Sequence, residues 1–205
     1  MCALFGSPDI ETFKALAWLN RKRGSHSYSV STTNQSNSHI DFIVRDVGDF
    51  RMPDVVGSYY IGHIQAPTTE AKDMSNIHPA QSDDMKSLLW HNGILFETYV
   101  KEMQEDLDDV CKWDTKLFQK MLLKYGFDIL STIKGSFACV LNNGYKTYLF
   151  RNENCPLFTD GKSYSSTWFQ NSNSIKPNVI YELANNKIEE TTITFSTAQE
   201  FFWTP

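Results

Sequence analysis

The chain opens with Met1-Cys2-Ala3-Leu4-Phe5-Gly6, in which a cysteine directly follows the initiator methionine. Removal of Met1 would leave Cys2 with two reactive groups, a thiol that attacks a carbonyl carbon and an α-amine that accepts the thiol proton. The α-amine titrates at roughly pH 7.7–8 in model peptides, so part of it is unprotonated at neutral pH. Residues 3–6 predict a short strand at the edge of a sheet. The alternative is a cysteine that serves only as a small apolar residue.

The composition favours a single globular domain and argues against a disordered, nucleic-acid-binding or membrane-spanning protein. The 205 residues are 41% hydrophobic and 14% aromatic, which is enough for one sizeable domain with a core and argues against global disorder. The formal net charge of −5 argues against a nucleic-acid partner, because such proteins carry a basic surface. No apolar run approaches the ~18 residues that span a bilayer. The N-terminus also lacks the pattern of a signal peptide, so we expect a cytoplasmic protein.

The cysteines and histidines do not predict a metal site or a cofactor site. The two histidines His63 and His91 have apolar neighbours and no carboxylate at triad-like spacing, so we expect buried structural histidines. The phosphate-binding patterns GxxxxGK[ST] and GxGxxG are absent. Widely spaced cysteines without a CxxC pair favour neither zinc nor a disulfide framework, and a reducing cytosol suits a working thiol. The four cysteines are Cys2, Cys111, Cys139 and Cys155.

The first half of the chain reads as a strand, a helix and a hairpin. Apolar residues at helical spacing predict an amphipathic helix over residues 9–22. A polar strand, a Ser/Asn-rich turn at 34–38 and a strand at 40–45 predict a hairpin. Residues 58–65 predict a buried strand from their β-branched and aromatic content. Residues 70–87 are polar and predict a long surface loop.

The second half places helices between groups of strands. Residues 88–95 form an apolar segment that Asn92-Gly93 interrupts, and this pair is typical of a hairpin turn. Helices are predicted at 96–104, from Asp114-Thr115 through Lys124, and at 127–133, with an acidic loop at 105–109. Helices grouped apart from antiparallel strands favour an α+β layered fold. Further strands are predicted at 135–141, 145–150, 162–168, 178–182 and 188–195, with a hairpin turn at 142–144.

Seven short segments carry a pattern that is stronger in combination than any one of them. They are Cys2-Ala-Leu-Phe-Gly6, Arg23-Gly24-Ser25-His26-Ser27, Gly62-His63-Ile64-Gln65-Ala66-Pro67-Thr68, His91-Asn92-Gly93, Asp114-Thr115, Gly135-Ser136-Phe137-Ala138, and Arg151 through Cys155-Pro156-Leu157. In this order and with these gaps, residues 1–170 resemble the class II glutamine amidotransferase (glutaminase) domain, an N-terminal nucleophile hydrolase.

The resemblance implies a four-layer αββα sandwich, with residues 1–205 as a single domain. It also implies a reaction, the hydrolysis of an amide by the Cys2 thiol. The Cys2 thiol would attack the side-chain amide of glutamine, release ammonia and form a γ-glutamyl thioester that water cleaves to glutamate. The Asn92 side-chain amide and the Gly93 backbone N–H would form the oxyanion hole, in which one donor is worth a few kcal/mol. Asp114 would hold the substrate α-ammonium group. Thr68 would contribute polar contacts near the α-carboxylate.

Each of these residues also has a structural interpretation. Asn92-Gly93 could be only a type I′ turn. Asp114 could be only the N-cap of its helix. Arg23 could support the N-terminus through structural ion pairs, and Thr68 could stabilise the turn at the adjacent proline.

The chain departs from the family pattern at several positions. The family has an arginine that clamps the substrate α-carboxylate where this chain has Gln65, and a charge-assisted contact of that kind is worth about 1.5–3 kcal/mol. Either another residue supplies the charge, with Lys72 as a candidate, or the substrate lacks a free α-carboxylate. Three other motif positions differ: the acidic residue of the second segment is His26, the family glutamate after Asp-Thr is Lys116, and the final segment is degraded up to Cys155.

The resemblance therefore predicts a divergent glutaminase that donates ammonia. The chain ends at Pro205 without room for a synthetase or transferase domain, so we expect a separate partner chain as the ammonia acceptor. Two alternatives stay open. One is an N-terminal nucleophile amidohydrolase that acts on another amide, and the other is a catalytically inactive binding or regulatory homologue.

Overall fold

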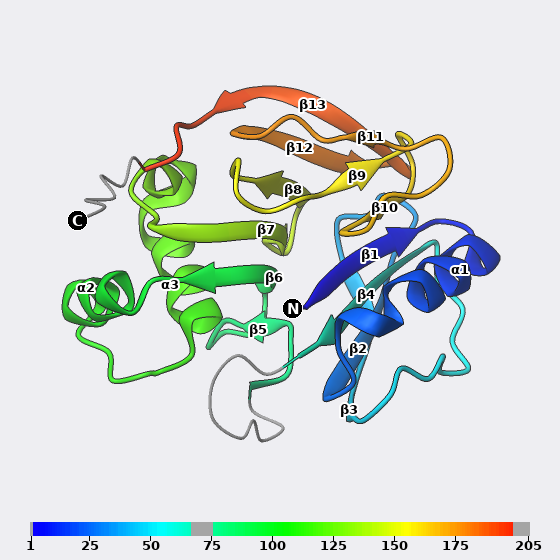
Figure 1. The fold of residues 1–205 in the computed structure, drawn as a ribbon, viewed down its shortest axis with the longest axis horizontal. Coiled ribbons are helices and arrows are strands. Elements are labelled where there is room, and N and C mark those ends of the chain that lie inside the picture. Colours follow the sequence, from blue (N-terminus) through cyan, green and yellow to red (C-terminus); the bar gives the residue numbers. More distant parts are fainter. Residues whose placement is uncertain (1, 67–75, 199–205) are drawn as a thin grey trace, which may run out of the picture.

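Two antiparallel sheets packed face to face form the centre of the computed structural model, which describes residues 2–66 and 76–198 (Figure 1). The first sheet has the strand order β11 (Asn173–Ser174), β9 (Phe158–Thr159), β10 (Tyr164–Ser165), β1 (Ala3–Ser7), β4 (Tyr59–Gln65), β2 (Ser27–Thr33) and β3 (Ile40–Val47). The second has the order β13 (Lys187–Thr194), β12 (Val179–Ala184), β8 (Thr147–Arg151), β7 (Gly135–Asn142), β6 (Leu88–Leu95) and β5 (Ala80–Gln81).

Helices cover the outer face of each sheet. Helix α1 (Ile10–Asn20) packs on the first sheet, and α2 (Glu97–Leu107) and α3 (Asp114–Tyr125) lie against the second (Figure 1). Two 3-10 helices, η1 (Arg21–Arg23) and η3 (Gly126–Ser131), extend α1 and α3. This order of layers confirms the predicted four-layer αββα sandwich. No helix in the described ranges is both long enough and apolar enough to cross a membrane.

Strand alternation divides the apolar residues among three cores, because successive side chains of a strand point to opposite faces of the sheet. In β1, Leu4 points between the sheets, whereas Ala3 and Phe5 pack under α1. In β7, Val140 points between the sheets and Cys139 packs under α3. The core between the sheets also contains Tyr59, Ile61, Trp90, Leu149 and Leu157, all fully buried.

The predicted elements of the first half agree with the structure, with one exception. Helix α1 begins after Asp9, whose Oδ1 accepts the N–H of Thr12 at 2.8 Å, and the hairpin of β2 and β3 is present. The prediction that the first strand lies at a sheet edge is wrong. Strand β1 is interior, because β4 pairs with one side of it and the two-residue strand β10 pairs with the other, at Phe5 and Gly6.

The second half contains one wrong prediction about a turn. Strand β6 continues through Asn92-Gly93 and pairs with β7 along its whole length, from Leu88 opposite Asn142 to Leu95 opposite Gly135. The predicted turn after β7 is confirmed, since β7 and β8 form a hairpin there. Helix α2 extends three residues into the predicted acidic loop. Within the predicted loop 70–87, residues 70–75 lie outside the described ranges and β5 occupies part of the rest.

Leu149→Ala tests the core between the sheets. Leu149 is fully buried there, so truncation leaves a cavity and should lower the free energy of unfolding by about 2–5 kcal/mol in urea titrations. The control is Leu123→Ala on α3. Leu123 is 51% exposed, so this substitution should change the free energy of unfolding by less than about 0.5 kcal/mol. Equal losses in the two variants would contradict the layer assignment.

Candidate active site

Cys2 lies immediately before β1 and is held by two neighbouring segments. Its Sγ lies 3.5 Å from the carbonyl oxygen of Ala66, which follows the antiparallel partner β4. Its own carbonyl oxygen accepts the Arg23 Nε–H at 2.9 Å. In the described ranges Arg23 takes part in no ion pair, so its supporting role is a hydrogen bond to the terminal residue.

Ser166, which follows β10, connects β1 to the second sheet. Its Oγ accepts the N–H of Leu4 at 2.9 Å and the Nδ2–H of Asn92 at 3.1 Å, and its own N–H donates to the Leu4 carbonyl at 2.8 Å. A carboxamide has two N–H groups, so Asn92 keeps a second one besides the bond to Ser166. The Ser166 hydroxyl thus joins Asn92 to Leu4, which is two residues after Cys2. Nothing in the sequence pattern pointed to Ser166.

Gly93 occupies a position that no other residue fits. Its φ is +147°, and a Cβ there would lie 1.9 Å from the carbonyl oxygen of Ser136 on β7. The glycine thus permits the close approach of β6 and β7, where sequence analysis had allowed for a turn. It also leaves the backbone N–H beside Asn92 free of a side chain.

Cys155 holds the backbone of the same strand. Its Sγ–H donates to the Asn92 carbonyl at 3.1 Å, and its side chain is buried. Burial raises the pKa of the Cys155 thiol to about 11, although the nearby Arg23 and Arg151 guanidinium groups oppose this and the Cys2 thiol adds to it. Cys155 is therefore protonated at neutral pH and acts as a hydrogen-bond donor. Sequence analysis had taken this position only as a degraded motif.

Gln65 is fully buried, and its carboxamide is engaged within the protein. Its Oε1 accepts the Ser27 hydroxyl at 3.2 Å and lies 3.4 Å from His78 Nδ1, and its Nε2–H donates to the Asn76 carbonyl at 3.3 Å. These contacts direct the carboxamide toward β2 and the segment before β5. The uncharged Gln65 carboxamide thus connects Ser27, Asn76 and His78 in a buried hydrogen-bond network.

Thr115 links that network to Asp114 on α3. Its Oγ1 lies 3.1 Å from His78 Nε2 and 3.2 Å from His91 Nδ1, and it donates to Asp114 Oδ1 at 3.3 Å. The His63 ring stacks on His78 with centroids 4.0 Å apart. The prediction that His63 and His91 are buried is confirmed. Sequence analysis missed His78, whose only signal was a His-Pro pair in a presumed loop.

Asp114 is the first residue of α3, and the cap position belongs to Trp113. The interpretation of Asp114 as the N-cap is therefore wrong by one residue, although its Oδ1 accepts the N–H of Thr115 at 2.7 Å. The structure joins Gln65 and Asp114 through His78 and Thr115. Thr68 and Lys72 lie outside the described residues.

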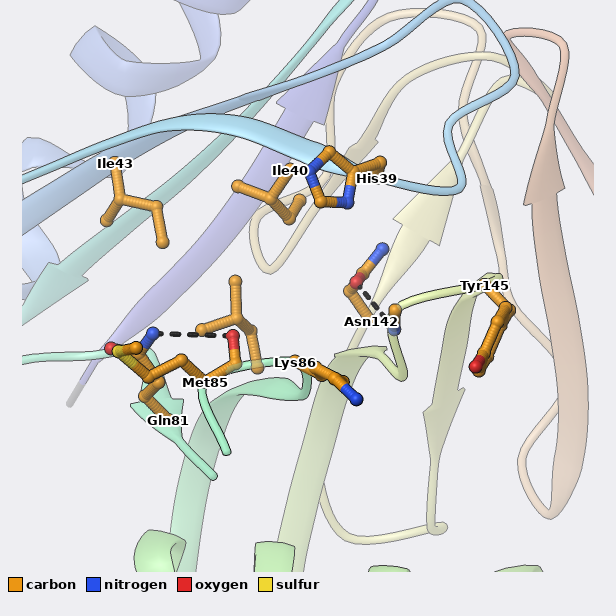
Figure 2. A pocket seen from close by; sticks show the side chains of 10 residues that line it. His39, Ile40, Ile43, Gln81, Met85, Lys86, Asn142 and Tyr145 are labelled. Atoms are coloured by element: carbon orange, nitrogen blue, oxygen red, sulfur yellow. Dashed lines mark hydrogen bonds between the residues drawn. The ribbon is translucent and has the colours of Figure 1, made fainter. Parts of the chain in front are cut away.

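Two hollows differ in their relation to this site. One, of about 660 Å³, is lined by residues 21–26 and Ala66, next to Cys2. The other, of about 380 Å³, lies between His39, Ile40 and Ile43 on one side and Lys86 and Asn142 on the other, and contains none of the predicted site residues (Figure 2). Within the described part of the chain, no three His, Cys, Asp or Glu side chains are grouped to hold a metal ion.

Comparison with solved structures identifies the class of fold. The chain matches a glutamine phosphoribosylpyrophosphate amidotransferase from B. subtilis with a TM-score of 0.66 and 18% identity, over 93% of this chain and 49% of that one. It matches a glutamine aminotransferase class-II domain protein from Silicibacter pomeroyi with a TM-score of 0.56 and 11% identity, over 95% and 100%. The chain has the fold of a class II glutamine amidotransferase domain.

Among curated proteins, the chain is similar to a glutamine–fructose-6-phosphate aminotransferase (isomerizing) from Geobacillus kaustophilus. The two are 29% identical over 135 residues, which are 58% of this chain and 22% of the relative. The chain thus spans less than a quarter of that relative and about half of the B. subtilis structure. No family model matches the chain.

Gly93→Ala tests the close approach of β6 and β7. The variant combines an unfavourable φ with a collision against the backbone of β7. Gly161→Ala is the matched control, because Gly161 has a φ of +90° but nothing within 4 Å of an added Cβ, so it should lose only about 1–3 kcal/mol of unfolding free energy. Gly93→Ala should lose clearly more in the same urea titration. Equal losses would contradict the assigned geometry.

The state of Cys155 can be tested by alkylation of the native protein at pH 8. With a pKa of about 11, roughly one Cys155 thiol in a thousand is ionised at that pH, and burial also excludes the reagent. Mass spectrometry should find Cys155 modified only after unfolding, whereas the half-buried Cys111 reacts in the native state. Rapid native labelling of Cys155 would overturn its assignment as a buried donor.

Proposed function

We propose that residues 1–205 form a single glutamine amidotransferase type-2 domain that hydrolyses the side-chain amide of glutamine. The observation that carries the proposal is the connection from Cys2 through Leu4 and Ser166 to Asn92. It brings a candidate nucleophile and a candidate oxyanion donor, which are 90 residues apart, into one bonded arrangement. The shared fold and the similarity to a glutamine–fructose-6-phosphate aminotransferase support glutamine as the substrate.

The proposed reaction begins after Met1 has been removed. The Cys2 thiol adds to the amide carbon, and its proton passes to the Cys2 α-amine. The carbonyl oxygen becomes an oxyanion, which the second Asn92 N–H and the Gly93 N–H stabilise. The amide C–N bond then breaks, and the leaving nitrogen takes the proton back from the α-ammonium group. Ammonia departs and a γ-glutamyl thioester remains.

Hydrolysis completes the cycle. Water adds to the thioester carbon, the C–S bond breaks, and glutamate leaves while the thiol regains its proton. Asp114 would bind the substrate α-ammonium group, and Thr115 would orient the Asp114 carboxylate through its backbone and hydroxyl bonds. Arg23 would hold the terminal residue in place through the Cys2 carbonyl. The role of Thr68 near the α-carboxylate stays a prediction.

We further propose that the ammonia passes to a separate synthetase or transferase chain. The similarity to a part of a larger aminotransferase supports an acceptor reaction outside the matched residues. The alternative, an amide substrate without a free α-carboxylate, is favoured by one observation, the inward-directed neutral side chain of Gln65. A reducing cytoplasmic location also stays a prediction.

Cys2→Ala tests the proposed nucleophile. Protein whose mass shows that Met1 has been removed should release ammonia and glutamate from L-glutamine, and Cys2→Ala should reduce the rate by on the order of 10³-fold or more. Cys111→Ala, which removes a half-buried thiol that bonds to the Trp113 carbonyl and to none of the proposed site residues, is the matched control and should keep the wild-type rate. A thiol-directed glutamine analogue should label Cys2 even if turnover needs the acceptor chain. Absence of both turnover and Cys2 labelling would overturn the proposal.

A further inference from the structure

A hollow of about 650 Å³ lies between α1 with η1 on one side and the segment that follows β3 on the other. Its residues come from positions 14–24 and 49–52, and none of them belongs to the proposed glutaminase site. Hollows of this size are typical of small-molecule sites, which combine an apolar wall with a few polar groups. This hollow is called the α1 pocket below.

The wall of the α1 pocket is apolar and rests on the core beneath α1. Ala17 is buried, and Phe50 and Met52 are partly buried against the same cluster. The Phe50 ring is held by aromatic contacts, with its centroid 5.8 Å from that of Phe5 and 5.3 Å from that of Tyr28. Such a wall suits a planar heterocycle, because aromatic and thioether groups pack well against flat rings.

The rim of the α1 pocket is cationic. Lys14, Trp18 and Arg21 follow one another at intervals of four and three residues, so α1 and η1 present them along one side. The Arg21 guanidinium lies 3.8 Å above the Trp18 ring, and its Nη1–H donates to the Trp18 carbonyl at 3.0 Å. Neither Arg21 nor Lys22 takes part in an ion pair in the described ranges. The two cations therefore favour an anionic ligand.

Carboxylates offset only part of this charge. Glu11 pairs with Lys14 at 2.7 Å. Asp49 lines the pocket, but among the described residues it pairs with no cation. The Asp49 carboxylate is thus placed to accept a hydrogen bond from a hydroxyl or amino group of a ligand.

The cationic side of the α1 pocket continues into the more open hollow described beside Cys2. The two hollows share Arg21 and Lys22, and the second adds Arg23 and His26. A single carboxylate would meet only part of such a row, whereas a chain of phosphates carries several charges that Arg and Lys bind well. The apolar wall and the row of cations therefore match a ligand with a planar heterocycle at one end and phosphates at the other.

We propose that the α1 pocket binds a nucleoside diphosphate or triphosphate, with the base against Phe50 and Met52 and the phosphates on Arg21 and Lys22. The glycine-rich patterns GxxxxGK[ST] and GxGxxG are absent, so side chains rather than loop amides make the phosphate contacts. This site goes beyond the proposed glutaminase reaction and does not depend on it.

Titration calorimetry with three probes tests the proposal: ATP, tripolyphosphate, which lacks the nucleoside, and adenosine, which lacks the phosphates. ATP should bind about tenfold or more tightly than either of the others, because only ATP fills both parts of the site. Arg21→Gln combined with Lys22→Gln should weaken ATP binding about 10- to 100-fold through lost charge-assisted contacts. Met52→Ala should weaken ATP binding about 3- to 10-fold and leave tripolyphosphate binding unchanged.

The control is Lys112→Gln combined with Lys187→Gln, which removes two charges from exposed positions outside the pocket and should leave ATP affinity unchanged. Equal affinity for ATP and tripolyphosphate would reduce the pocket to a non-specific anion surface and overturn the proposal. So would ATP binding that survives the loss of Arg21 and Lys22, or absence of ATP binding at millimolar concentration. Cys2→Ala protein should bind ATP as tightly as the unsubstituted protein, so this proposal and the glutaminase proposal fail separately.

Discussion

The position of β1 inside the first sheet is the constraint on which the candidate site depends. Strand β4 pairs with one side of β1, and β10 pairs with the other, so neither β1 nor the Cys2 that precedes it can shift along the sheet. Ser166 follows β10 directly and therefore reaches both Leu4 and the facing Asn92. The residue after a two-residue strand thus connects the two sheets by hydrogen bonds beside Cys2.

A second set of interactions surrounds this centre with buried polar groups. Gln65, His78, Thr115 and Asp114 form one hydrogen-bonded series from the first sheet to α3. Buried polar groups are costly unless they are paired, so such a series restricts each member to one orientation. A neutral carboxamide at position 65 suits this environment, since an arginine there would place a charge among stacked imidazole rings.

Local signals predicted much of the fold, and long-range contacts explain what they missed. Helix α1 and the hairpin turn after β7 depend on capping and turn residues within a few positions, so their sequence signals were sufficient. The interior place of β1 depends on its pairing with β10, about 160 residues away. A strand was predicted at 162–168, but no local signal shows which strand it pairs with. The turn prediction at Asn92-Gly93 was wrong because the glycine is needed for a close approach to the Ser136 carbonyl on β7, which no local signal shows.

The candidate site shows the same division. Cys2, Asn92, Gly93, Gln65 and Asp114 were predicted from the resemblance of their motifs to a family, but the roles of their connecting groups were not. Ser166, Cys155 and His78 bond to segments that are distant in the sequence, and neither Ser166 nor His78 stands in a motif of its own, whereas Cys155 stood only in a degraded one.

The stacking of Arg21 on Trp18 has a practical consequence. Trp18 is 66% exposed, whereas Trp90 is fully buried, and the Arg21 guanidinium lies 3.8 Å above the Trp18 ring. Indole emission responds to the charge and solvent around the ring. The chain therefore contains an intrinsic fluorescent reporter on α1, and changes around the Arg21 guanidinium can be followed optically without attaching a dye.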